Sequence, residues 1–286
     1  MSTVPVAKES LMARMRNIRV TNVRLYLGIT IISVVILMAI FASHLTKFSP
    51  ITQDLMNTLA SPSSKHLLGT DNLGRDVWSR LLFGARTDLF LASAAVLAPF
   101  VIGTLIGAIS GYFSGWLDTI VMRIADIVVA FPFYVLVISL VFILGNGVSS
   151  IFIAITVVSW VAYARIVRGE TLVLRSKEFI EAAQTGGLSN RQIITRHVLP
   201  NVITQAVVYA MSDIVLNIGV IVTLSYFGLG IVPPTPDWGR MISEGQQFLA
   251  GGYYYLTVLP AIAVIITSLG LSFIGDGLAQ VLRVKR

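Results

Sequence analysis

The stretch EAAQTGGLSNRQIITRHVLP, residues 181–200, is a polar interruption between two long apolar segments. Residues 178–184 have the composition of a short helix, and Gly186 and Gly187 supply the left-handed stop that such a helix favours. Ser189 predicts the start of a second helix, because Gln192 three residues later completes a capping-box pattern. Pro200 predicts the boundary before the next apolar segment. The stretch therefore predicts two short helices joined by a glycine elbow.

The composition of the chain is that of a membrane protein. Hydrophobic residues make up 55% of the 286 residues and charged residues 12%, whereas soluble domains carry about 25% charged residues. We therefore expect an all-α, polytopic protein with membrane lipids as its neighbours. The net charge of +7 could suggest nucleic acid, but the basic residues cluster beside apolar segments. That pattern is typical of membrane-protein loops and predicts no nucleic-acid partner. The absence of cysteine excludes disulfides and thiolate chemistry.

Six apolar segments predict about six transmembrane helices. The first, 25–45, follows a basic N-terminal segment at 1–24. It is longer than the apolar core of a secretory signal, about 7–15 residues, and long enough to cross a bilayer, which takes about 20. Residues 46–88 are expected outside the membrane core, with a short interfacial helix over 71–86. The other five spans form one core over 89–286 and are expected at 89–111, 120–144, 149–167, 202–227 and 253–274.

The distribution of basic residues predicts the orientation of these spans. Six spans that start in the cytoplasm place both termini and the loop 168–200 inside. With this topology 15 of the 21 lysines and arginines flank the cytoplasmic side and six lie outside. Cytoplasmic loops carry such an excess in membrane proteins, so we expect a cytoplasmic loop at 168–200 and an extracytoplasmic segment at 46–88.

Small, charged and proline residues within the spans predict how the helices pack. Gly103, Gly107 and Gly111 repeat every four residues, so they lie on one helix face and allow a second backbone to approach closely. Arg123 and Asp126 are three residues apart and can form an ion pair. Pro132 lies in the middle of its span and should bend it.

Asp213 lies near the middle of the fifth span. A carboxylate in that position is costly and is a candidate functional group by default, here on a translocation path. The alternative is a structural hydrogen bond to a neighbouring helix or to Asn217, one turn away. The sequence leaves both interpretations open.

The 181–200 loop resembles the EAA loop of ABC-transporter permease subunits, whose pattern is E-A-A, three residues, Gly, nine residues and I-x-L-P. His197 stands where isoleucine is usual. A second stretch, 233–239, resembles the PPTPxWG signature of dipeptide and oligopeptide permeases of the C type. The amino-acid sequence of 66–86 is similar to the same family. The residues that fit are Glu181, Ala182, Ala183, Gly187, Leu199 and Pro200 in the first pattern, and Pro233, Pro234, Pro236, Asp237, Trp238 and Gly239 in the second.

The resemblance implies the type I permease fold of ABC importers, in a bacterial cytoplasmic (inner) membrane. It implies an ATP-driven importer of di- or oligopeptides in which the EAA loop docks the ATPase. The partners it implies are a homologous second permease subunit, two ATP-binding subunits that use ATP and Mg, and an extracytoplasmic solute-binding protein. Permeases of similar sequence carry glutathione and chelated nickel, so the resemblance does not identify the substrate.

The sequence contains no catalytic or metal-binding motif. None of its five lysines follows a glycine, so there is no P-loop, and HExxH and GxSxG are absent. We therefore expect no enzyme activity, no metal site and no cofactor in this chain, with any ATP hydrolysed by another polypeptide. Two other interpretations remain. One is an ion-gradient-driven secondary transporter that uses Asp213 as its coupling carboxylate, and the other is a membrane receptor or structural subunit without transport.

Overall fold

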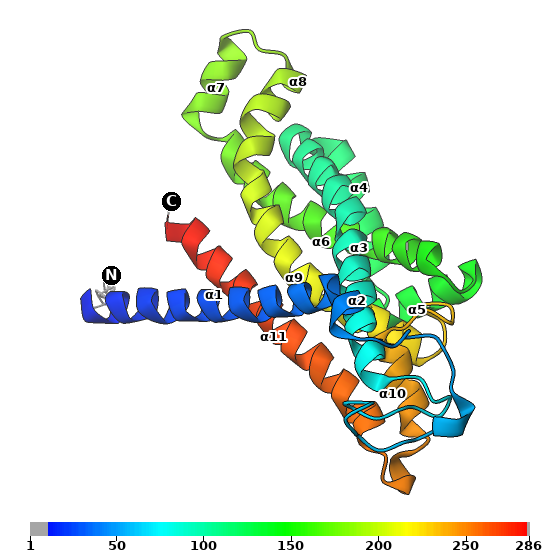
Figure 1. The fold of residues 1–286 in the computed structure, drawn as a ribbon. Coiled ribbons are helices and arrows are strands. Elements are labelled where there is room, and N and C mark those ends of the chain that lie inside the picture. Colours follow the sequence, from blue (N-terminus) through cyan, green and yellow to red (C-terminus); the bar gives the residue numbers. More distant parts are fainter. Residues whose placement is uncertain (1–10, 285–286) are drawn as a thin grey trace, which may run out of the picture.

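The computed structural model describes residues 11–284, with side chains over 23–282, and within that range the regular elements are all helices (Figure 1). The predicted all-α polytopic class is confirmed. The helices are α1 Leu11–Ile40, α2 Ala42–Leu45, α3 Val77–Phe113, α4 Gly115–Val129, α5 Phe133–Leu144, α6 Val148–Arg175, α7 Glu178–Thr185, α8 Asn190–Ile193, α9 Leu199–Tyr226, α10 Trp238–Gln246 and α11 Tyr255–Val284. Single turns lie at Leu55–Asn57, Ile194–Val198 and Leu249–Gly251.

Within the described part of the chain, five helical segments are long and apolar enough to cross a membrane, and a bent pair of helices brings the number to six. The bent pair is α4 and α5, which meet at an angle of 87°. Pro132 ends the break and precedes the first residue of α5. A proline lacks the backbone N–H that a continuing helix needs, and it disfavours helical geometry in the residue before it. The predicted bend is therefore present, and it divides the expected span 120–144 into two helices.

The predicted short interfacial helix over 71–86 is wrong. Residues 71–76 form a turn, and the helix starts at Val77, where the Asp76 carboxylate accepts a hydrogen bond from the Ser79 amide at 2.7 Å. From there α3 continues without interruption to Phe113 and passes through Pro99. No turn signal follows Arg86 in the sequence, so one helix includes both residues 77–86 and the predicted span 89–111.

The boundary predicted at Pro200 is also wrong, because α8, the turn Ile194–Val198 and α9 form one continuous helical segment from Asn190 to Tyr226. The turn is a π-helix, in which the Leu199 amide donates to the carbonyl of Ile194, five residues earlier. Next to it the Asn201 side chain donates to the His197 carbonyl at 2.6 Å. The wider turn accommodates a proline ring that would otherwise crowd an α-helical carbonyl. Pro200 thus changes the hydrogen-bond pattern and does not end the helix.

The three spaced glycines of α3 form its contact with α6, as predicted. A β-carbon on Gly103 would lie 2.4 Å from the Trp160 carbonyl oxygen, and one on Gly107 would lie 2.4 Å from that of Ala164. Glycine also permits the crossing of α1 over α11 (Figure 1), where a β-carbon on Gly28 would lie 2.7 Å from the Gly270 carbonyl oxygen. Small residues let helix backbones touch in lipid, where apolar side chains gain little from leaving the acyl chains.

Substitution of Gly107 by leucine should destabilise the bundle, because a side chain there meets backbone atoms of α6 that cannot move aside. Overpacking of this kind costs about 1–3 kcal/mol. The midpoint of thermal unfolding in detergent micelles should fall by several degrees. Gly169→Leu is the matched control, since no atom lies within 4 Å of a β-carbon at that exposed position of α6. Equal midpoints for the two variants would contradict this prediction, because they would show that α3 and α6 can move apart without loss of stability.

Candidate functional site

The 181–200 stretch folds as the sequence predicts up to its last residues. Helix α7 ends at Thr185, and Gly187 has φ +80°, a conformation that favours glycine. The Leu188 amide donates to the Ala183 carbonyl at 3.2 Å and so closes the end of α7. Ser189 and Gln192 form the predicted capping box at the start of α8. The result is a helix–elbow–helix unit over 178–193, which we call the elbow.

The elbow protrudes from one end of the bundle, the end opposite to α10 and the 46–76 segment (Figure 1). It is fixed by apolar side chains, since Ile180 and Ile193 are fully buried in a cluster that also contains Tyr163 of α6 and Val202 of α9. The Tyr112 hydroxyl at the end of α3 donates to the Asn190 side chain at 3.0 Å and accepts from Gln184 at 3.3 Å. The elbow is thus anchored to three long helices at its base.

The outer surface of the elbow is available to another molecule. Glu181, Ala182 and Gly187 of the elbow are exposed, and Ala183 is half-buried. Beyond the elbow, at the start of α9, Leu199 is half-buried and Pro200 is exposed. Phe179 is 45% exposed, with its ring 6.4 Å from that of His197. The exposed face therefore includes small side chains, the carboxylates of Glu178 and Glu181, and one aromatic ring.

The second sequence signature, 233–239, divides into an exposed and a buried half. Pro233 and Pro234 are exposed, together with Thr235, whereas Pro236, Asp237, Trp238 and Gly239 are buried. The Trp238 indole donates to the Leu81 carbonyl at 3.1 Å, and its amide donates to the Asp88 carboxylate at 3.0 Å.

Trp238 is enclosed by the protein, since only 1% of the residue is exposed. A β-carbon on Gly239 would lie 2.2 Å from the Val222 carbonyl oxygen of α9. The Asp237 carboxylate accepts from the Arg240 amide at 2.9 Å and so caps α10. The buried half of this signature therefore joins α10 to α3 and α9.

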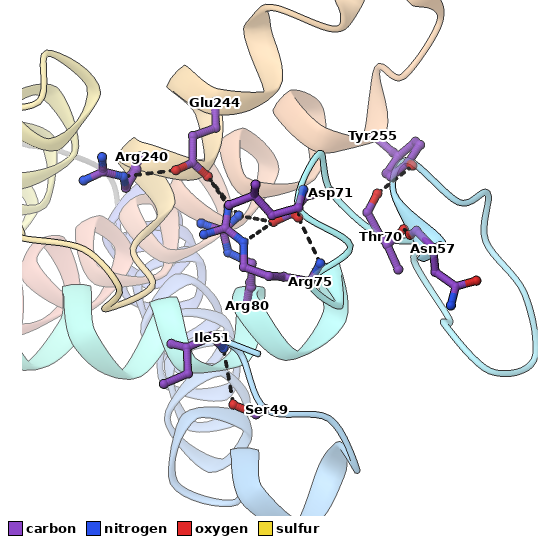
Figure 2. A network of polar contacts seen from close by, with 11 residues as sticks. Ser49, Ile51, Asn57, Thr70, Asp71, Arg75, Arg80, Arg240, Glu244 and Tyr255 are labelled. Atoms are coloured by element: carbon purple, nitrogen blue, oxygen red, sulfur yellow. Dashed lines mark hydrogen bonds and ion pairs between the residues drawn. The ribbon is translucent and has the colours of Figure 1, made fainter. Parts of the chain in front are cut away.

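A polar network at the same end of the bundle joins residues that are distant in sequence (Figure 2). Arg75 lies 2.7 Å from Asp71 and 2.7 Å from Glu244, 169 residues away. Arg80 also bonds both carboxylates, at 3.0 Å from Glu244, and Arg240 reaches Glu244 at 3.1 Å. The sequence did not predict this network, because no local pattern relates Asp71 and Arg75 to α10.

The Glu244 carboxylate lies in a strongly cationic environment. Burial raises the pKa of this group, whereas the charges of Arg80 and Arg75 and hydrogen bonds from Arg80 and Arg240 lower it, and the pKa lies below its ordinary value. A group with a lowered folded-state pKa stabilises the fold above its unfolded-state pKa, and this contribution is lost as the pH falls through the folded-state value.

Glu244→Gln should therefore lower the midpoint of thermal unfolding at neutral pH. The difference from the wild type should shrink as the pH falls below the ordinary glutamate pKa of about 4.3, because the wild-type carboxylate then becomes protonated. Glu181→Gln, which removes a carboxylate from the exposed face of the elbow, is the control. It should leave the midpoint unchanged both at neutral pH and at the lower pH. A pH-independent difference between Glu244→Gln and the wild type would contradict the assignment.

Asp213 lies on the wall of a cavity, and its hydrogen-bond partner was not predicted. The Tyr163 hydroxyl of α6 donates to Asp213 Oδ2 at 2.8 Å. The alternative partner Asn217 does not bond it, and both polar atoms of the Asn217 side chain lack a partner among the described residues. The cavity, of about 790 Å³, is lined by residues of α4, α5, α6 and α9 and of the break between α4 and α5. Sequence reasoning could not find Tyr163, which is 50 residues from Asp213.

The predicted ion pair between Arg123 and Asp126 is long, at 3.9 Å, and both side chains are exposed. Asp126 instead lies 2.7 Å from Arg165, which also lines the cavity. Among the described residues, no group of three His, Cys, Asp or Glu side chains is placed to hold a metal ion.

Comparison with known proteins identifies the family. Residues 103–285 match the family described as binding-protein-dependent transport system inner membrane component. The chain is 39% identical to the dipeptide transport system permease protein DppC of Alkalihalophilus pseudofirmus, over 90% of this chain and 84% of that protein. It is 40% identical to the glutathione transport system permease protein GsiD of Pectobacterium atrosepticum, over 78% of this chain and 74% of that protein. It is 39% identical to the oligopeptide transport system permease protein OppC of Bacillus subtilis, over 90% of this chain and 84% of that protein.

The chain therefore belongs to the family of binding-protein-dependent transport system inner membrane components. It is a membrane permease component of an ABC importer, a multi-pass protein of the bacterial inner membrane, as the sequence motifs predicted.

Proposed function

We propose that this permease moves di- or oligopeptides into the cell and that separate ATP-binding subunits drive it through the elbow. Two of the similar relatives are named for dipeptide and oligopeptide transport, which supports a peptide substrate. The proposal includes a homologous second permease subunit, two ATPases that use ATP and Mg, and a solute-binding protein on the extracytoplasmic side. In this orientation the elbow lies in the cytoplasm and the 233–239 loop lies outside.

The observation that carries the proposal is the position and construction of the elbow. A docking element must present an exposed surface beyond the headgroups and transmit a displacement to the transmembrane helices. The elbow protrudes (Figure 1), and its exposed face carries Glu181 and Ala182. Its buried face, with Ile180 and Ile193, packs in one cluster with Tyr163 of α6 and Val202 of α9. Because close-packed side chains transmit strain, a displacement of the elbow reaches the helices that line the cavity.

Gly187→Leu should uncouple the permease from its ATPase. Gly187 has φ +80°, so a side chain there strains the elbow, and the leucine would also project from the docking face. The variant should insert normally into the membrane, but it should no longer co-purify with the ATP-binding subunits, and ATP-dependent uptake should fall at least about tenfold, the equivalent of about 1.4 kcal/mol of lost docking energy.

The matched control for this experiment is Gly252→Leu. Gly252 has φ +86°, has equally open surroundings and lies far from the elbow in sequence, so the backbone strain is the same. It should keep the ATPase subunits bound. Glu181→Lys, which reverses the charge on the docking face, should weaken co-purification without backbone strain. Normal co-purification of both elbow variants would remove the docking role.

A second candidate function is transport driven by an ion gradient, and the buried position of Asp213 on the cavity wall is the observation that favours it. The two mechanisms differ in what this carboxylate must do. An ion-coupled transporter needs it to gain and lose a proton or another cation, whereas an ATP-driven importer needs only a polar group that bonds Tyr163.

With ATP present and the proton gradient collapsed by an uncoupler, wild-type vesicles that contain the full complex should still take up peptide. Under these conditions Asp213→Asn should retain substantial uptake at saturating peptide, since asparagine still accepts the Tyr163 hydrogen bond. Asp213→Leu should do worse, because the buried hydroxyl loses its partner at a cost of about 1–3 kcal/mol. Complete loss of wild-type uptake on addition of the uncoupler would favour the ion-coupled mechanism.

A further inference from the structure

The cavity beside the α4–α5 break has the size of a small-ligand site. Its volume of about 790 Å³ lies within the range of about 300–1,000 Å³ that is usual for such sites. Its lining is mainly apolar, with side chains such as Phe133, Val158 and Leu216. The polar groups on this lining come from a few residues of α5, α6 and α9, and among them only Asp213 and Arg165 are charged.

The carboxylate on this lining has no cationic partner among the side chains that the structure describes. Asp213 is 2% exposed, and its Oδ2 atom accepts from Tyr163. Over the described side chains, 23–282, no Lys, Arg or His lies within ion-pair distance of it. The Tyr163 ring packs edge-on against Tyr209, also on the lining, at 4.8 Å between ring centres. One hydroxyl and two aromatic rings compensate a buried negative charge poorly.

The cationic group on the same lining is part of a site with surplus positive charge. Arg165 lies 2.7 Å from Asp126, which lies 3.9 Å from Arg123 as well, so two guanidinium groups share one carboxylate. The side chains of Arg165 and Asp126 are 43% and 55% exposed. Exposed ion pairs of this kind contribute about 0–1 kcal/mol, so Arg165 can exchange Asp126 for a carboxylate on a ligand at small cost.

From this charge distribution we propose that the cavity binds the peptide as a zwitterion, with Asp213 receiving the terminal ammonium group and Arg165 the terminal carboxylate. This inference rests on the proposed peptide-import function and assigns the residues that select the substrate within the membrane. The ammonium supplies the positive charge that Asp213 lacks, and the carboxylate neutralises the surplus at Arg165. The apolar lining between the two charges accommodates peptide side chains of different kinds.

This chain contains no cysteine, so a thiol introduced into it is the single thiol of this subunit, and its labelling on this subunit reports on occupancy of the cavity. Leu216 lies on the cavity lining, is 47% exposed and follows Asp213 by three residues on α9. We would place Leu216→Cys in the full complex in nanodiscs and measure its reaction with a membrane-permeant methanethiosulfonate reagent. The probes are one dipeptide with both termini free, its N-acetyl derivative and its C-terminal amide. Thr235→Cys, on the exposed loop and outside this cavity, is the control that no peptide should protect.

The free dipeptide should protect Cys at position 216, and each blocked derivative should need at least about a tenfold higher concentration, because a charged hydrogen bond is lost. In the Asp213→Asn background the free and N-acetyl peptides should become equal, while the amide still binds more weakly. In the Arg165→Gln background the free acid and the amide should become equal, while the N-acetyl derivative still binds more weakly. This exchange of specificities separates recognition from general damage to the fold.

Equal protection by the free and blocked peptides in the otherwise unmodified complex would overturn the inference. An unreactive thiol at position 216 would overturn it as well, since another protein segment would then fill the cavity. Both results leave the proposed import function intact if ATP-dependent uptake of the free dipeptide is normal in the same preparation. Absence of that uptake would instead contradict the proposed function.

Discussion

The backbone contact between α3 and α6 is the constraint on which the other features of the molecule depend. In a bilayer, helices gain little by hiding apolar side chains from equally apolar lipid, so close approach and interhelical polar bonds must hold them together. Gly103 and Gly107 allow that approach. Once α6 is fixed against α3, Arg168 of α6 holds α4 through Asp118, at 2.6 Å. Tyr163 of the same helix bonds Asp213 of α9. One helix thus positions both walls of the cavity and the base of the elbow.

The two ends of the bundle are built on different principles. At the end with the elbow, apolar side chains such as Ile180 and Ile193 fix a short unit whose outer face stays exposed. At the other end, charged groups hold the structure together, because Arg75 and Arg80 join the segment before α3 to Glu244 of α10 (Figure 2). A chain that carries 12% charged residues places several of them, buried or partly buried, in this single network. The network makes the irregular 46–76 segment part of the folded unit.

The sequence predicted those features whose cause lies within a few residues. The capping box at Ser189, the left-handed Gly187, the bend at Pro132 and the glycine face of α3 depend on local geometry, and all four are present. The features it did not predict depend on contacts across the fold. Tyr163 and Asp213 are 50 residues apart, and Arg75 and Glu244 are 169 apart, so no spacing rule relates them. The end of a helix at Pro200 was predicted from local sterics, which the wider turn before it relieves.

That turn also determines which way the following helix faces. A π-turn accommodates about one residue more than an α-turn, and each residue of an α-helix advances the direction of its side chain by about 100°. The turn at Ile194–Val198 therefore rotates everything after it by about that angle relative to the elbow. With a regular α-turn in its place, the side chain at position 213 would point away from α6, and the Tyr163 hydroxyl would face a different residue. A change of register of about one residue, within a turn of five residues, thus decides the polarity of a cavity wall several turns further along the helix.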